Sequence, residues 1–130
     1  MNRFLFSFAV FVTLTCFAGN VNSKELIREF NGSESKTTVE FEVKAPWIVD
    51  WRTRGDYPGQ MAVEVNLLTV TGEYVGKIVT TKYVSNGVRL FDESGTYHFQ
   101  VDSSLANWTV RVEQLTQAEA ETYKPKKPYE

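Results

Sequence analysis

The sequence predicts an all-β fold: an antiparallel, jelly-roll-like β-sandwich of about seven to eight strands. Two neighbouring segments, 96–102 and 108–113, alternate between apolar and polar residues, which is the pattern of half-buried strands. Two such strands in antiparallel array form a sheet with one apolar face, and that face needs a second sheet over it. Turn-forming residues recur along the chain at the short spacing that is typical of sandwiches.

Residues 1–23 are predicted to be a secretory signal peptide that precedes the domain. Arg3 is followed by an apolar run with no charge before Lys24, which is the layout of an exported precursor. Cleavage is expected between Ser23 and Lys24, with cleavage after Ala18 as an alternative. The run is short for a bilayer crossing, so we expect a periplasmic or secreted protein without a stable membrane span.

Removal of residues 1–23 would take away one of the 14 basic residues and none of the 16 acidic ones, leaving a formal charge of −3. A weakly acidic chain has no electrostatic attraction to nucleic acid, so we expect no such partner. The only cysteine, Cys16, would leave with the signal, so neither disulfides nor thiol chemistry are expected. The alternative is a lipid anchor at Cys16, although Thr13 and Thr15 are poor residues before a lipidated cysteine.

The domain is expected to span 24–115. The alternating and apolar segments predict strands at 25–30, 38–44, 47–52, 61–70, 73–83, 88–91, 96–102 and 108–113. In the second of these, Val39, Phe41 and Val43 are expected to face inward. Pro46 ends that strand because proline cannot donate to a ladder.

Two further features punctuate the chain. Leu67-Leu68 shifts the phase of the longest apolar alternation, which predicts a bulge or a strand that changes sheet. The strand pattern stops after Leu115. Residues 116–123 have room for two helical turns, but the lysines and prolines that follow favour a flexible C-terminal tail over 116–130.

Several short segments follow one another in the order Phe41-Glu42-Val43, Trp47-Ile48-Val49, Val63-Glu64-Val65, Ser94-Gly95-Thr96-Tyr97 and Trp108-Thr109-Val110. This order, over about 39–113, resembles small extracellular jelly-roll modules, namely bacterial pre-peptidase C-terminal domains and, more distantly, CUB-type domains. The resemblance implies a jelly roll. Those bacterial domains often carry an acidic cluster in a middle strand, where this chain offers only Glu64 and Asn66, so a calcium site is not implied.

The sequence offers few candidate residues for catalysis or metal binding. His98 is the only histidine, and it lies on the polar side of a predicted strand, which does not suit a hydrolytic triad. Zinc sites need several His or Cys ligands, so we expect no metal and no cofactor. Carboxylates such as Asp50, Glu64 or Asp92 leave a carboxylate-dependent hydrolase as a minor alternative.

Binding residues are sought on one strand and the loop after it. Trp47 and Trp51 point to the same side of the strand, where they form either core or a stacking platform for a sugar, and core is the simpler interpretation. The loop 53–60, with its Arg54-Gly55-Asp56 sequence, is exposed by composition. The candidate binding residues are Trp47, Trp51, Arg52, Arg54, Asp56 and Tyr57. Asn31 and Asn107 lie in N-glycosylation acceptor patterns.

These features together favour an exported, non-catalytic binding module that holds a protein or glycan partner on one sheet face or on the 53–60 loop. An inhibitor- or immunity-like protein that plugs a secreted enzyme is a specific version. The alternatives are a structural subunit of a cell-envelope assembly that uses edge-strand pairing, and the hydrolase named above.

Overall fold

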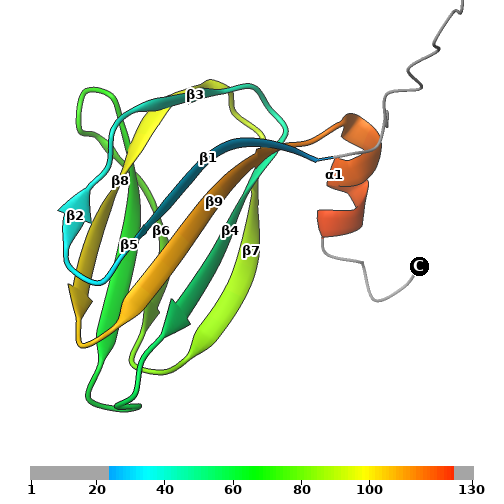
Figure 1. Ribbon diagram of the computed structural model, residues 1–130. Coiled ribbons are helices and arrows are strands. Elements are labelled where there is room, and N and C mark those ends of the chain that lie inside the picture. The colour runs from blue at the N-terminus through cyan, green and yellow to red at the C-terminus, as the bar shows by residue number, and fades with distance from the viewer. Residues whose placement is uncertain (1–23, 125–130) are drawn as a thin grey trace, which may run out of the picture.

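A computed structural model describes residues 24–124 of the chain as two facing β-sheets and one short helix (Figure 1). The predicted signal peptide, Cys16 and the end of the predicted tail, 125–130, lie outside the described residues. The elements are β1 (Glu25–Gly32), β2 (Lys36–Thr37), β3 (Phe41–Val43), β4 (Trp47–Arg54), β5 (Ala62–Thr69), β6 (Tyr74–Thr81), β7 (Ser85–Phe91), β8 (Gly95–Ser104), β9 (Asn107–Gln114) and α1 (Gln117–Tyr123).

The strands form an antiparallel sandwich, as the sequence predicts. One sheet has four strands in the order β1-β9-β4-β7, and the other has β8, β5 and β6 in sequence, with β2 and β3 both pairing with β8. The chain changes sheet at every connection except β2–β3 and β5–β6. If β2 and β3 count as two halves of one strand, eight strands wrap in the manner of a jelly roll.

A bulge separates β2 from β3 and corrects one detail of the predicted strand. Thr37 lies opposite Gln100 and Phe41 opposite Tyr97, so three residues on one strand face two on the other. Thr38 turns inward, and its Oγ1 accepts a hydrogen bond of 2.9 Å from the Phe99 amide. Val39 therefore points outward and is 65% exposed, although the alternation predicted it inside.

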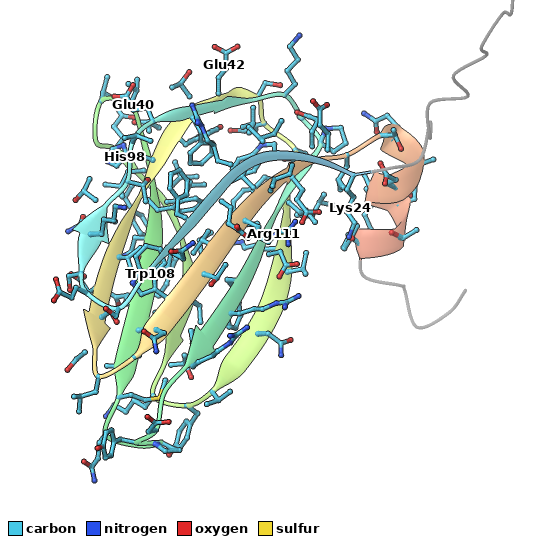
Figure 2. All side chains as sticks on the ribbon, in the orientation of Figure 1. Lys24, Glu40, Glu42, His98, Trp108 and Arg111 are labelled. Atoms are coloured by element: carbon cyan, nitrogen blue, oxygen red, sulfur yellow. The ribbon has the colours of Figure 1, made fainter. Side chains whose placement is uncertain are left out.

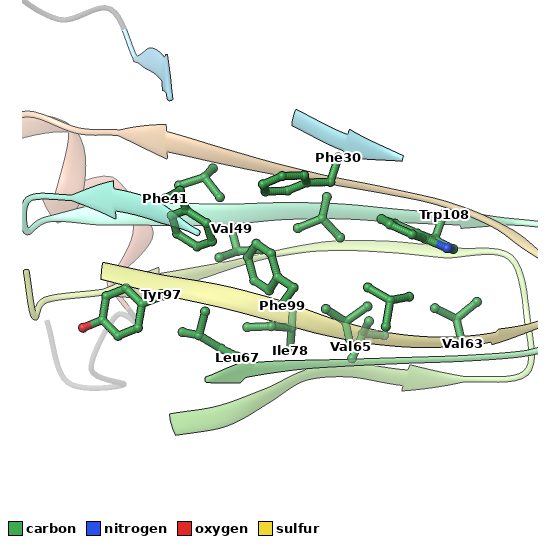
Figure 3. Close-up of a cluster of buried hydrophobic side chains, with 14 of the residues drawn as sticks. Phe30, Phe41, Val49, Val63, Val65, Leu67, Ile78, Tyr97, Phe99 and Trp108 are labelled. Carbon is green, nitrogen blue, oxygen red and sulfur yellow. The ribbon is translucent and has the colours of Figure 1, made fainter. Parts of the chain in front are cut away.

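Aromatic and branched side chains from both sheets fill the core (Figure 3). The Phe41 and Phe99 rings stack at 5.1 Å across the β3–β8 pair. Trp47 is fully buried, stacks on Phe91 at 4.5 Å, and donates its indole N–H to the Glu93 carbonyl at 2.9 Å. Pairing of the polar indole group is what allows so large a ring to be buried completely.

The phase shift at Leu67-Leu68 corresponds to a shift in register between β5 and β6. The register passes from Leu67 opposite Gly76 to Leu68 opposite Tyr74, so Val75 of β6 is the extra residue. A second shift between Val65 and Asn66 bulges β6 again. The predicted bulge is confirmed, and it lies on the edge strand of its sheet.

The first part of the predicted flexible tail is an ordered helix, which is a correction. Thr116 caps α1: its hydroxyl accepts from the Glu119 amide at 3.1 Å, and the Glu119 carboxylate accepts from the Thr116 amide at 2.9 Å. This reciprocal pair is a capping box. Ala120 packs with Leu115 and with Ile48 of β4, so the helix covers apolar side chains on the outer face of the four-stranded sheet. That burial stabilises a segment too short to be helical alone.

Candidate functional site

One end of the sandwich, at the bottom of Figure 1, is formed by loops and turns alone. It comprises 33–35 between β1 and β2, 55–61 between β4 and β5, 82–84 between β6 and β7, and 105–106 between β8 and β9. We call this region the loop end. Two of the predicted binding residues, Asp56 and Tyr57, lie there, and Arg54 ends the strand that leads into it.

Trp47 belongs to the core, and Trp51 packs against the edge of it. Trp47 has no exposed surface, and Trp51 is half-buried and packs against the same cluster. The indole of Trp51 lies over Gly87 of β7, where an added Cβ would come within 2.6 Å of the ring. The core interpretation is therefore confirmed for Trp47, and the platform interpretation is wrong for it.

Arg52 lies apart from the loop residues, on the outer face of the four-stranded sheet. It lines a shallow depression with Asp50 of the same strand and Asn86 and Val88 of β7. The predicted binding residues are thus divided among three places: the core, this sheet face and the loop end.

The β4–β5 loop is held rigidly at the loop end. Met61 is fully buried, and its amide and that of Gln60 both donate to the Tyr57 carbonyl at 3.0 Å. The Gly59 amide donates to the Lys82 carbonyl at 2.8 Å, which joins this loop to the β6–β7 loop. A Cβ on Gly55 would lie 2.7 Å from the Met61 sulfur, so glycine permits this close packing.

The β8–β9 turn presents an aliphatic side chain in a strained backbone conformation. Leu105 has φ of 57°, in the left-handed region that costs a non-glycine residue about 1–2 kcal/mol. Its side chain is 57% exposed, while its neighbour Ala106 is buried and accepts a hydrogen bond from the Ser103 hydroxyl at 3.0 Å. The surrounding structure therefore enforces a backbone that holds Leu105 outward.

Four large apolar side chains stand exposed at the loop end: Tyr57, Tyr83, Val84 and Leu105. Tyr57 and Leu105 line a depression together with polar residues, among them Ser33, Asp56 and Asn107. The four come from three different connections, so they reach the same end of the sandwich only in the folded chain. We call them the apolar quartet.

Sequence analysis identified one residue of the apolar quartet, Tyr57, and missed the other three. Tyr83 ends the strand predicted at 73–83, Val84 follows it directly, and Leu105 lies between the strands predicted at 96–102 and 108–113. The available signal at Leu105 was an aliphatic residue directly after the turn-forming Asp102-Ser103-Ser104. No sequence signal places Tyr83 beside the β4–β5 loop, because the Gly59–Lys82 hydrogen bond connects distant parts of the chain.

The carboxylates considered for catalysis do not converge. Asp50 lies on β4 of the four-stranded sheet, Glu64 on β5 of the five-stranded sheet, and Asp92 after β7. Glu64 forms an ion pair with Lys77 at 3.0 Å, and the hydrogen bond from Lys77 lowers the pKa of the Glu64 carboxyl. His98 lies on β8 near Glu40 in Figure 2, and within residues 24–124 no group of three or more His, Cys, Asp or Glu side chains has the arrangement of a metal site.

The opposite end of the four-stranded sheet is closed by α1 and by a set of charges, and we call it the helix end (Figure 2). Lys24 Nζ donates to the Tyr123 hydroxyl at 2.8 Å and lies 3.8 Å from the nearly buried carboxylate of Glu113. Arg111 approaches the same carboxylate at 3.4 Å. The hydrogen bond to Tyr123 raises the pKa of Lys24, and Glu113 adds to the effect.

No protein-family model matches the chain, and no curated protein matches its sequence. In the described part of the chain, no helix has the length and apolar character needed to cross a membrane.

Proposed function

We propose that this protein is an exported, non-catalytic binding module that holds a protein partner at its loop end. The observation that carries the proposal is the apolar quartet, which stands exposed on loops that are themselves anchored by the buried Met61 and Ala106. Tyrosines and large aliphatic residues in a preformed arrangement are suited to protein interfaces, because little conformational entropy is lost on binding.

A protein partner suits this surface better than a glycan. Sugar binding by stacking needs an open aromatic face, and of the two tryptophans that offered one, Trp47 is buried in the core and Trp51 is half-buried against it. Val84 and Leu105 gain most from burial against apolar protein surface, at about 25 cal/mol per Å². Charges of both signs are also exposed near the loop end, on Arg54, Asp56 and Lys82, and such charges are typical of the polar rim of an interface.

The inhibitor- or immunity-like version of the proposal gives Leu105 a specific role. An aliphatic side chain held outward by a strained, well-anchored turn is a suitable anchor for a pocket on a secreted enzyme. A fold maintains a strained residue at a cost to its stability, and such residues cluster at functional sites. Export is supported by the signal-peptide pattern of residues 1–23.

The test is capture of a partner from the exported protein fraction of the source organism. The double variant Tyr57→Ser/Tyr83→Ser should lose the partner, since each interfacial tyrosine contributes about 2 kcal/mol, or roughly thirtyfold in affinity. The matched control is Tyr74→Ser, because Tyr74 is 64% exposed, against 56% for Tyr57 and 61% for Tyr83, and begins β6 at the other end of the sandwich.

The proposal fails if the double variant and the control capture the same partner equally. It also fails if the wild-type protein captures glycans alone, in which case the depression beside Arg52 becomes the better site. Hydrolysis of a captured glycan would instead favour the carboxylate-dependent enzyme.

A further inference from the structure

The edges of the two sheets differ in regularity. β1 is bulged against β9, with a register shift between Leu26 and Arg28. The edge made by β2 and β3 is interrupted at 38–40, and β6 is bulged twice against β5. β7 is different: its seven residues pair with β4 in unbroken register, from Trp47 opposite Phe91 to Thr53 opposite Ser85.

Bulges and interruptions are the usual means by which proteins prevent a sheet edge from pairing with another chain. Within residues 24–124, every edge except β7 has one. A regular edge strand presents alternate backbone N–H and C=O groups to whatever lies beside it. The edge of β7, which α1 contacts beside Leu90, therefore remains competent to add a strand along its regular register.

Charge does not protect this edge either. β7 has one charged residue, Arg89, whereas β1 has Glu25, Arg28 and Glu29. The Arg89 guanidinium is turned back onto its own molecule, where it donates to the Lys77 carbonyl and lies 5.1 Å from the centre of the Phe91 ring.

Val88, at the middle of β7, is 46% exposed. We propose that β7 pairs antiparallel with β7 of a second copy of this chain, about a two-fold axis at Val88. The two four-stranded sheets then join into one continuous sheet across the dimer. This interface is separate from the loop end and does not depend on the function proposed above.

The sequence of β7 is complementary to itself in this register. With Val88 opposite Val88 of the second copy, Gly87 lies opposite Arg89 and Asn86 opposite Leu90. The single charge of the strand therefore faces a glycine and never its own copy. Two-fold pairing of this kind is self-limiting, because each copy uses its one open edge. Self-complementarity favours a second copy over an unrelated peptide as the occupant.

A disulfide at the axis is the direct test. Opposed residues in an antiparallel pair have Cα atoms about 4.5–5.5 Å apart, which is within disulfide range. In a chain with Cys16→Ser, Val88→Cys should form a covalent dimer under mild oxidation. The control is Val39→Cys, at the interrupted edge, because Val39 is also exposed, at 65%. Equally fast cross-linking of the two variants would overturn the proposal.

Charged substitutions at Val88 test the same register without a covalent cross-link. Val88→Glu and Val88→Lys should each weaken self-association roughly tenfold in sedimentation equilibrium, because like charges then meet across the axis. An equimolar mixture should restore association. A wild-type protein that stays monomeric at every concentration, or a mixture that fails to recover, would overturn the proposal. Far-UV circular dichroism checks folding, and Tyr57→Ser/Tyr83→Ser should still dimerise.

Discussion

The helix end and the loop end treat apolar side chains in opposite ways. At the helix end, Ile48 lies on the outer face of the four-stranded sheet, yet α1 covers it so fully that none of its surface is exposed. At the loop end, Tyr83 and Leu105 are more than half exposed and nothing in the described chain covers them. The same strands run between both ends.

The difference teaches what each end contributes. Covering Ile48 and Leu90 with a capped helix removes apolar surface from water, and this contributes to the stability of the chain itself. Exposed side chains at the loop end contribute little to the stability of the fold. They can therefore be arranged for contact with a partner. The two ends should therefore respond differently to the same kind of substitution.

The largest expected effect is at the helix end. Ile48→Ala should lower the free energy of unfolding by about 2–5 kcal/mol, because it removes a fully buried side chain beneath α1 and leaves a cavity. Urea denaturation measures the change. The matched substitution at the loop end, Val84→Ala, should stay within about 0.5 kcal/mol, because Val84 is 60% exposed. Equal losses at the two sites would remove the distinction between the ends.

The strained turn gives an effect of opposite sign. Leu105→Gly should raise the free energy of unfolding by about 1 kcal/mol, because glycine adopts φ of 57° without the steric cost that leucine incurs. The gain is partly offset by the greater freedom of glycine in the unfolded chain. The same variant should bind the captured partner more weakly.

Leu105→Ala is the control for this variant, since it shortens the side chain and keeps the backbone penalty. Weaker binding by both variants, with a stability gain in the glycine variant alone, separates strain from contact. A loss of stability in Leu105→Gly would show that the left-handed backbone is not strained here.

A substitution in the helix cap tests whether the capping box of Thr116 and Glu119 stabilises α1 at the helix end. Thr116→Ala should cost about 1 kcal/mol, because the Glu119 amide loses its acceptor. Hydrogen exchange should then quicken in α1 while the β4–β9 ladder keeps its protection. Thr122→Ala is the control, because the Thr122 hydroxyl bonds to the Glu119 carbonyl outside the capping box. Unchanged exchange in α1 would contradict the prediction.

Most strands of the sandwich could be predicted from the sequence, because the alternation of apolar and polar residues is a local property. The segments around Phe99 and Val110 show the period of two, and each buries the predicted face. The helix was missed although Thr116 and Glu119 have the spacing of a capping box, because the prolines beyond it favoured a flexible tail. The inward turn of Thr38 was also missed, since it depends on a hydrogen bond to a distant strand.

The candidate site was less predictable than the fold. Composition alone identified the loop 53–60 as exposed; residues 56–60 are exposed, whereas Thr53 belongs to β4 and is buried. Val84 and Leu105 join that loop only through folding, so no local pattern could reveal them. Trp51 illustrates the reverse case: its position on the strand was right, but its partner Gly87 lies on a strand reached only through the fold.

The smallest expected effect concerns the tie between Lys24 and Tyr123. The pKa of Lys24 is raised in the folded chain, first by its hydrogen bond with Tyr123, above the ordinary value of 10.5. A raised pKa means that the protonated form stabilises the fold below pH 10.5, and that this contribution is lost as pH rises through the folded-state pKa. Because Lys24 is well exposed, solvent keeps the contribution small.

Lys24→Met should therefore be slightly less stable than the wild type at neutral pH, and the two stabilities should converge as pH rises above 10.5. Thermal unfolding across this pH range measures the difference. Lys124→Met is the matched control, because within residues 24–124 Lys124 pairs with Glu121 alone, on the exposed side of α1, and does not bridge to β1. A Lys24 difference that persists unchanged at high pH would mean that side-chain packing, and not the proton of Lys24, secures the helix end.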